Sequence, residues 1–231
     1  MRSKRSRLDQ FIAQKLQISK KAVRQLLLAN RVELDGQICK SVDQQINEFS
    51  QICFDGNWLQ RNKRQYYMLN KPIGVVSATK DDIHPTALSL LYGIEPELLH
   101  IAGRLDLNST GLLLITNDSQ WSQALMAPET KVDKQYLVTL ANPIDDTYVS
   151  AFAEGMYFGY EDITTKPARL EPVNDFQARV TLQEGKYHQI KRMFGRFCNP
   201  VVGLHRESIG DIILDSTLKS GEYRHLNKNE I

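Results

Sequence analysis

The sequence has 231 residues, of which 42% are hydrophobic and 24% are charged, and its formal net charge is +2. Its longest aliphatic run, residues 112–115, is far shorter than the roughly 18–20 apolar residues of a membrane-spanning helix. No apolar segment of a secretory signal follows the basic N-terminus. The three cysteines are widely spaced, which argues against a disulfide framework and a zinc site. We therefore expect a protein of the reducing cytoplasm, with no membrane partner.

The charge is unevenly divided along the chain. Residues 1–64 hold 13 Lys and Arg against 6 Asp and Glu, whereas residues 65–231 hold 16 against 21. Within the basic part, apolar residues at helical spacing predict a helix over 8–16 and a second helix that begins after Ser19. The dipeptide Asp35-Gly36 predicts a hairpin turn. These features indicate a small module that binds a polyanion.

The rest of the chain alternates between short strands and short helices. Strands are expected at 66–69, 99–102, 112–115, 134–140, 169–173 and 176–183. Helices are expected at 88–91, after the N-cap Asp118, from Asp145 to Gly155, and in the segment that begins at Gly185. In the last of these, helical spacing predicts that His188, Lys191, Arg192 and Gly195 lie on one face, opposite a buried apolar stripe, so that the cations are presented together.

A polar corner between two apolar segments stands out in this alternation. An apolar strand ends at Gly103, and the run 112–115 is typical of a strand buried on both faces. The loop between them carries Asp106 and Ser109. Both residue types are common turn formers, because their side chains bond nearby backbone. The alternative is functional: two rigid strands would hold the Asp106 carboxylate in a cleft.

Conventional catalytic motifs are absent from the sequence. It has no GxSxG, HExxH or phosphate-binding Walker loop, and its five histidines are scattered. We therefore expect no metal and no cofactor.

The basic N-terminal part resembles the S4-type RNA-binding domain. The resemblance rests on RLDxFIA (7–13), SKKA (19–22) and NRVELDG (30–36), in this order. It implies that the module binds RNA, and the basic residues available for the contact are Arg7, Lys20, Lys21 and Arg24. The second helix of this family usually opens with Ser-Arg, whereas this chain has Ser19-Lys20, which keeps the charge but loses the guanidinium fork.

Four further blocks resemble the pseudouridine synthases of the RsuA type. They are YMLNKPxG (67–74), AGRLDxxSTGLL (102–113), KxYxV (134–138) and EGKYHQIKRM (184–193). The resemblance implies an α/β (α+β) chain with an S4-like domain at 1–58, a linker at 59–65 and a catalytic domain at 66–231. The catalytic domain would have a mixed, largely antiparallel sheet and a central cleft.

This resemblance implies an RNA uridine isomerase and assigns three catalytic residues. Asp106 would be the nucleophile, since a carboxylate can both attack and leave; the attacked atom, C1′ of the sugar or C6 of the uracil, stays open. Lys191 would supply the cation that favours the ionised carboxylate in a closed site. Tyr136 would stack on the target uracil, the alternative being a tyrosine packed in the core.

Other residues would contact the RNA. Arg104 matches the position that fills the stack left by the flipped nucleotide, and further contacts are expected from Arg192 and Lys71. Flipping is least costly in loops and bulges, so a structured RNA with an accessible loop is the expected substrate.

The motifs favour 16S rRNA, at position 516, as the substrate of a monomeric enzyme, within a small-subunit assembly intermediate. Ser208 and Asp211 depart from the family pattern, which casts doubt on RNA contacts near them. The alternatives are a 23S rRNA target, a non-catalytic ribosome-assembly factor, and an aspartate-dependent glycosidase. The last would need a second carboxylate, for which no partner motif is evident.

Overall fold

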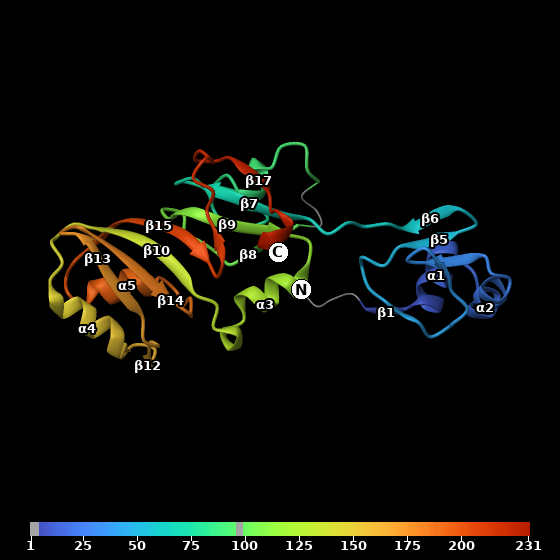
Figure 1. The fold of residues 1–231 in the computed structure, drawn as a ribbon, viewed down its shortest axis with the longest axis horizontal. Helices are drawn as coiled ribbons and strands as arrows, with labels where there is room; N and C mark the ends of the chain where they lie inside the picture. The colour runs from blue at the N-terminus through green and yellow to red at the C-terminus, as the bar shows by residue number, and fades with distance from the viewer. Residues whose placement is uncertain (1–4, 96–98) are drawn as a thin grey trace. The chain divides into compact units, whose positions relative to one another are not determined.

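The computed structural model describes residues 5–95 and 99–231 (Figure 1). By its internal contacts the chain divides into an N-terminal unit, Met1–Arg64, and a C-terminal unit, Gln65–Ile231. No helix in the described parts is both long and apolar enough to cross a membrane. Each unit has its own hydrophobic core.

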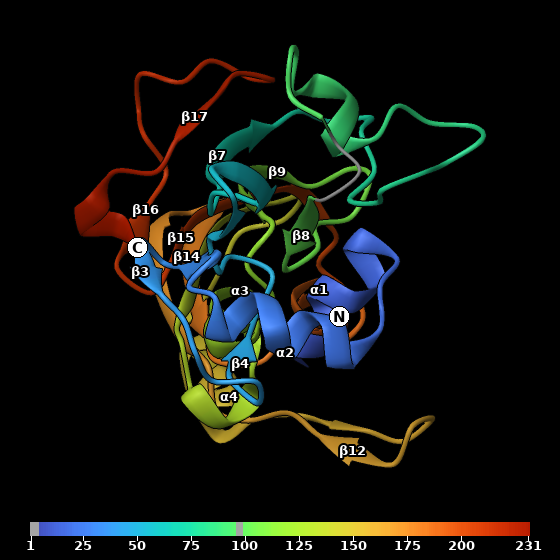
Figure 2. The ribbon, with the colours of Figure 1, turned by 90° about the vertical axis from the view of Figure 1, so that its right-hand side faces the viewer.

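The N-terminal unit packs two helices against a small sheet. Helix α1 (Leu8–Leu16) and helix α2 (Lys20–Leu28) lie beside one another in Figure 2. Ser19 caps α2 as predicted, because its hydroxyl accepts a hydrogen bond from the Ala22 N–H at 3.1 Å. The sheet has the order β3-β2-β5-β6, and β1 pairs with β4. These strands are β1 (Ser6–Arg7), β2 (Val32–Leu34), β3 (Gln37–Ile38), β4 (Gln45–Ile46), β5 (Ile52–Phe54) and β6 (Asn57–Gln60).

Strand β6 extends this unit into the segment that the sequence assigns to a linker. Its antiparallel partner is β5, with Cys53 opposite Trp58 and Ile52 opposite Gln60. Leu59 packs against the core of the unit, and Gln60 donates from its amide to the Asn47 carbonyl at 2.8 Å. A linker that begins at residue 59 is therefore wrong for residues 59 and 60. The polar composition is that of an edge strand, which buries little surface.

Within its described residues, the C-terminal unit is built on one mixed sheet of nine strands with the main order β13-β14-β10-β15-β9-β7-β17. The pair β15 and β9 is parallel and the other pairs are antiparallel, which confirms the predicted sheet type. The strands are β7 (Tyr66–Lys71), β8 (His100–Ala102), β9 (Thr110–Thr116), β10 (Lys134–Leu140), β13 (Arg169–Asn174), β14 (Gln177–Leu182), β15 (Val201–Ile209), β16 (Ile212–Ile213) and β17 (Tyr223–His225).

Helices pack on this sheet over two hydrophobic cores. Helix α4 (Asp146–Glu154) and helix α5 (Gln189–Gly195) pack with β10, β13 and β14, on one side of these strands in Figure 1. Helix α3 (Ser119–Met126) packs beside β8 and is capped by Asp118, as predicted. A hairpin of β11 (Tyr157–Phe158) and β12 (Ile163–Thr164) projects from the unit in Figure 2. Short 3₁₀ turns cover Ala87–Leu90, Pro128–Thr130 and Lys228–Glu230.

Helix α5 begins four residues later than the sequence predicts. His188, just before its first residue, has left-handed backbone angles, φ 49° and ψ 30°. The side chain of Gln189 accepts the Lys186 N–H at 3.0 Å, and its own N–H donates to the Lys186 carbonyl at 3.1 Å. These bonds form a tight turn over residues 185–188 in place of the first helical turn.

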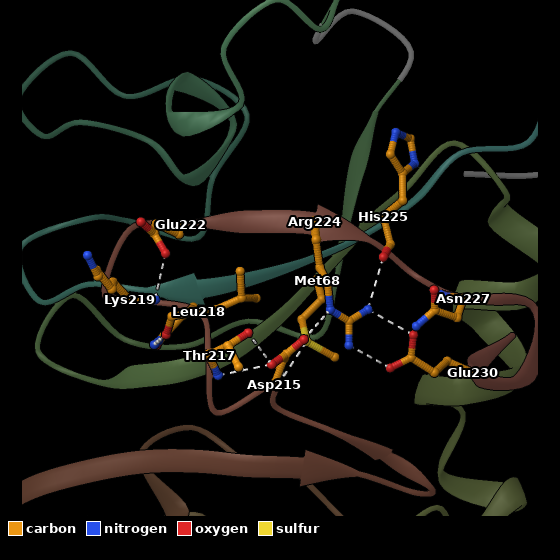
Figure 3. Close-up of polar contacts among 11 residues, drawn as sticks. Met68, Asp215, Thr217, Leu218, Lys219, Glu222, Arg224, His225, Asn227 and Glu230 are labelled. Carbon is orange, nitrogen blue, oxygen red and sulfur yellow. Dashed lines mark hydrogen bonds and ion pairs between the residues drawn. The ribbon is translucent and has the colours of Figure 1, made fainter.

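The C-terminal segment is held on the sheet by an ionic network (Figure 3). Strand β17 pairs with β7, and Arg224 contacts Asp215 at 2.6 Å and Glu230 at 2.9 Å. Hydrogen bonds from the side chain and backbone of Thr217, together with that from Arg224, lower the pKa of Asp215 to about 2. The end of the chain is therefore an integral part of the C-terminal unit.

Candidate active site

The polar corner is a rigid loop between β8 and β9. The Ser109 N–H donates to the Asp106 carbonyl at 3.0 Å, and the Gly74 N–H donates to the Leu107 carbonyl at 2.9 Å. Gly111 has φ +99°, and a Cβ at this position would lie 2.4 Å from the Arg206 carbonyl oxygen. Only glycine fits this close approach of β9 to β15. The predicted strand, loop and buried strand are confirmed, and the loop holds Asp106 at one place.

The Asp106 carboxylate meets two basic side chains from the turn and first residues of α5. Lys191 Nζ lies 3.0 Å from Asp106 Oδ2, and His188 Nε2 lies 3.4 Å from the same oxygen. The three side chains are 30 to 35% exposed. The carboxylate is therefore paired with a cation and still open to a substrate. His188 belongs to the block EGKYHQIKRM (184–193), but its contact with Asp106 depends on the left-handed turn.

A cavity of about 90 Å³ opens beside Asp106. Tyr136 is buried at its wall, and Arg104 is exposed at its edge. The cavity is also lined by Leu105, Ser109, Leu182, Gly185, Lys186, His188, Gln189, Ile190 and Leu204. Asp106 and the Tyr136 ring thus line one small cavity, and Lys191 pairs with the carboxylate.

A larger hollow, of about 790 Å³, lies on the opposite face of β10 and β15. Gln135 and His205 line it, whereas their neighbours Tyr136 and Arg206 face the other way. Its rim carries four carboxylates, those of Glu171, Glu207, Asp211 and Asp215. This excess of negative charge disfavours a ligand that carries phosphate groups, such as RNA. The smaller cavity is therefore the candidate active site.

Lys71 does not lie on the RNA side of this site, and the prediction of an RNA contact is corrected. Its side chain is 0% exposed. The ammonium donates to the carbonyls of Pro72 at 3.0 Å, Leu107 at 3.4 Å and Ser109 at 2.7 Å. Burial lowers the pKa of Lys71 to about 8, and the charge of Asp106 opposes this shift. Lys71 therefore braces the loop that carries Asp106.

Arg206 is a second buried cation beneath the loop, and the sequence analysis missed it. It is 1% exposed, and its guanidinium donates to the carbonyls of Leu112 at 2.8 Å, Gly103 at 3.3 Å and Arg104 at 3.4 Å. It also lies 6.0 Å from the centre of the Tyr136 ring. The available signal was its position two residues after Leu204 on a strand, where an inward side chain is expected.

Arg192 faces away from Asp106, although it follows Lys191 directly. Its guanidinium contacts Glu161 at 2.5 Å and lies 4.1 Å over the Phe158 ring. Successive helical residues differ by about 100° in direction, which separates the two cations. The prediction that Lys191 and Arg192 are presented together is wrong, and of these two only Lys191 reaches the carboxylate.

The predicted RNA contacts of the N-terminal unit are on its surface. Lys20, Lys21 and Arg24 are exposed on α2. Arg7 is half-exposed and makes an ion pair with Asp9 at 2.9 Å, which neutralises part of its charge.

Comparison with protein families gives two matches that lie in the two units. Residues 65–195 match the family described as RNA pseudouridylate synthase, and residues 6–52 match the S4 domain. The first match contains Asp106, Tyr136 and Lys191.

Individual relatives match nearly the whole chain. A protein of Pseudomonas aeruginosa named ribosomal small subunit pseudouridine synthase A is 48% identical over 97% of this chain and 98% of its own length. The Escherichia coli protein of the same name is 45% identical over the same shares. A solved structure titled crystal structure of pseudouridylate synthase is 42% identical, covers 97% of both chains and has a TM-score of 0.71. This chain therefore belongs to the RNA pseudouridylate synthase family and carries an S4 domain before its catalytic domain.

Proposed function

We propose that this enzyme converts one uridine of 16S rRNA, at position 516, to pseudouridine. The names of its relatives, which specify the ribosomal small subunit, support this target. The observation that carries the chemistry is the Asp106 carboxylate, 3.0 Å from Lys191 Nζ, at the mouth of a cavity walled by Tyr136.

In this proposal Asp106 is the nucleophile, at C1′ or at C6. The carboxylate bonds to one of these carbons, the bond between N1 of uracil and C1′ of the sugar breaks, and the uracil turns in the cavity. A bond then forms between C5 and C1′, and the bond to Asp106 breaks, which restores the carboxylate. N1 gains a proton and C5 loses one, so no cofactor is consumed. Lys191 favours the ionised, nucleophilic form of the carboxylate through its charge. Tyr136 stacks on the uracil and keeps it bound while it turns.

RNA binding divides between the two units. Flipping the target nucleotide costs a few kcal/mol, least where the RNA is unpaired. Arg104, exposed at the cavity edge, takes the place of the flipped nucleotide. Lys20, Lys21, Arg24 and, more weakly, Arg7 contact phosphates. Arg192 can contact RNA only with the part of its guanidinium that Glu161 leaves free.

The physiological substrate in this proposal is a small-subunit assembly intermediate in the cytoplasm, and the enzyme acts as a monomer. Position 516 must be accessible for flipping, which an incompletely folded particle permits more readily than a finished subunit. The C-terminal unit of one chain carries all the proposed catalytic residues, so no second copy is needed.

Mapping pseudouridine in rRNA from cells with and without the protein tests this function. We expect the modification at 16S position 516 to disappear on deletion and to return with the wild-type gene but not with Asp106→Asn, since an amide is a poor nucleophile. Purified Asp106→Asn should still bind the RNA. Loss at a 23S site would overturn the target, and full modification by Asp106→Asn would overturn the mechanism.

A further inference from the structure

Tyr187 presents its ring to solvent at the rim of the active site. The residue is 77% exposed, and its ring stacks on the imidazole of His188 with centres 3.9 Å apart and planes 20° apart. His188 in turn lies 3.4 Å from the Asp106 carboxylate. Two parallel rings therefore lead outward from the nucleophile.

The turn beneath these rings is firmly held. Gln189, which is buried, donates to Glu184 Oε1 at 2.7 Å and accepts the Lys186 N–H at 3.0 Å. The Lys166 N–H also donates to Glu184 Oε1, at 2.8 Å. These bonds tie the turn to Glu184 and, through Glu184, to the backbone at Lys166. The left-handed conformation of His188 directs the two rings to the rim. An aromatic ring on a fixed support loses little freedom when it binds a ligand.

We propose that Tyr187 and His188 form a stacking platform for the RNA base next to the flipped uridine. This inference rests on the proposed RNA substrate. Flipping a nucleotide removes one stacking partner from each neighbour, and single-stranded bases commonly stack on exposed aromatic side chains. Tyr136 is buried in the cavity wall and takes the target base, so the exposed Tyr187 ring is left for its neighbour.

Exposure alone does not select Tyr187. Tyr92 is 80% exposed, but its carbonyl accepts a hydrogen bond from Tyr223 on β17, at the other end of the sheet order from β14 and β13. Tyr92 therefore lies away from the cavity and serves as a matched control for the loss of an exposed tyrosine.

The test compares Tyr187→Ala, Tyr187→Phe and Tyr92→Ala on the RNA fragment in which the wild-type enzyme forms pseudouridine. Stacking by one base predicts that Tyr187→Ala lowers kcat/KM about tenfold to a hundredfold. Tyr187→Phe and Tyr92→Ala should stay within about twofold of wild type. Because Tyr187 is exposed, its truncation should leave the thermal unfolding temperature unchanged, which a melting curve checks.

A second arm replaces one base beside the target uridine by an abasic residue, on each side in turn. On one side this should slow the wild-type enzyme as much as Tyr187→Ala does, and it should slow the Tyr187→Ala variant no further. Independent, additive losses would overturn the platform, as would an unchanged kcat/KM for Tyr187→Ala. Because the fragment is chosen by its modification, a wrong rRNA target overturns the proposed function but leaves this test valid.

Discussion

The two units use basic residues in opposite ways. In the N-terminal unit, Lys20, Lys21 and Arg24 point into solvent from one short helix. In the C-terminal unit, Lys71 and Arg206 are buried and donate to backbone carbonyls of the loop that carries Asp106. Identical residue types thus serve as surface charge in one unit and as internal braces in the other.

This difference predicts different energetics. Exposed cations attract phosphates at long range, are screened by salt and contribute roughly independently of one another. A buried cation is desolvated, and its net value depends on hydrogen bonds of good geometry. Its removal should therefore affect folding and catalysis together, whereas removal of a surface cation should affect RNA affinity alone.

The largest effect is expected for Arg206→Met. The loop carbonyls of Gly103 and Arg104 and the β9 carbonyl of Leu112 would lose their donor, and at roughly 1 kcal/mol or more for each, the free energy of unfolding should fall by about 3 kcal/mol. Single-turnover rate should also fall at least tenfold, because the loop that holds Asp106 loosens. Urea denaturation and rapid-quench kinetics measure the two quantities. Arg206→Lys keeps the charge and part of the hydrogen bonding, so its stability and rate should lie between those of wild type and Arg206→Met. A stable and fully active Arg206→Met would show that the buried cations do not differ in this way from the surface cations of the N-terminal unit.

A smaller effect is expected when Lys20, Lys21 and Arg24 are all replaced by Gln. RNA affinity should fall, and the slope of log K against log salt should become shallower by about 2 to 3, according to the number of phosphates released. The turnover rate at saturating RNA should not change. Filter binding at several salt concentrations measures the slope, with Lys40→Gln as an exposed control outside α2. A lower turnover rate in the triple variant would show that these charges do more than bind.

The smallest effect is expected at Asp215, a carboxylate that pairs with the Arg224 cation. The pKa of Asp215 is lowered from 3.8 to about 2 by Thr217 and Arg224, so the folded state binds a proton less readily than the unfolded state does. The resulting stability should be complete above about pH 4 and disappear as the pH falls to about 2. Unfolding of wild type and Asp215→Asn should therefore differ at neutral pH and converge toward pH 2. A difference that persists at pH 2 would assign the stability to another cause.

Local patterns in the sequence predicted much of the candidate site. The buried run in β9, the cap of α3 by Asp118 and the inward face of β10 with Tyr136 follow from hydrophobic spacing and short-range hydrogen bonding. The family motifs added the expectation that Asp106 and Lys191 meet, and the structure brings them within 3.0 Å.

Spacing failed where a residue's surroundings depend on distant parts of the chain. Lys71 was predicted to contact RNA, and a lysine is seldom buried, yet loop carbonyls 36 and 38 residues away enclose it. Arg192 was predicted to share a face with Lys191, and its direction toward Glu161 and the Phe158 ring depends on the β11–β12 hairpin.

The sequence by itself determined most of the strands and helices, which unit is basic and which loop bears the carboxylate, because these depend on residues that are close in the sequence. Only the tertiary structure decided which cations reach that carboxylate and which brace the loop beneath it. Arg206 bonds to a carbonyl 94 residues away, and Lys191 contacts a carboxylate 85 residues away. Such contacts arise from the packing of β15 and α5 against the loop, which no local pattern encodes.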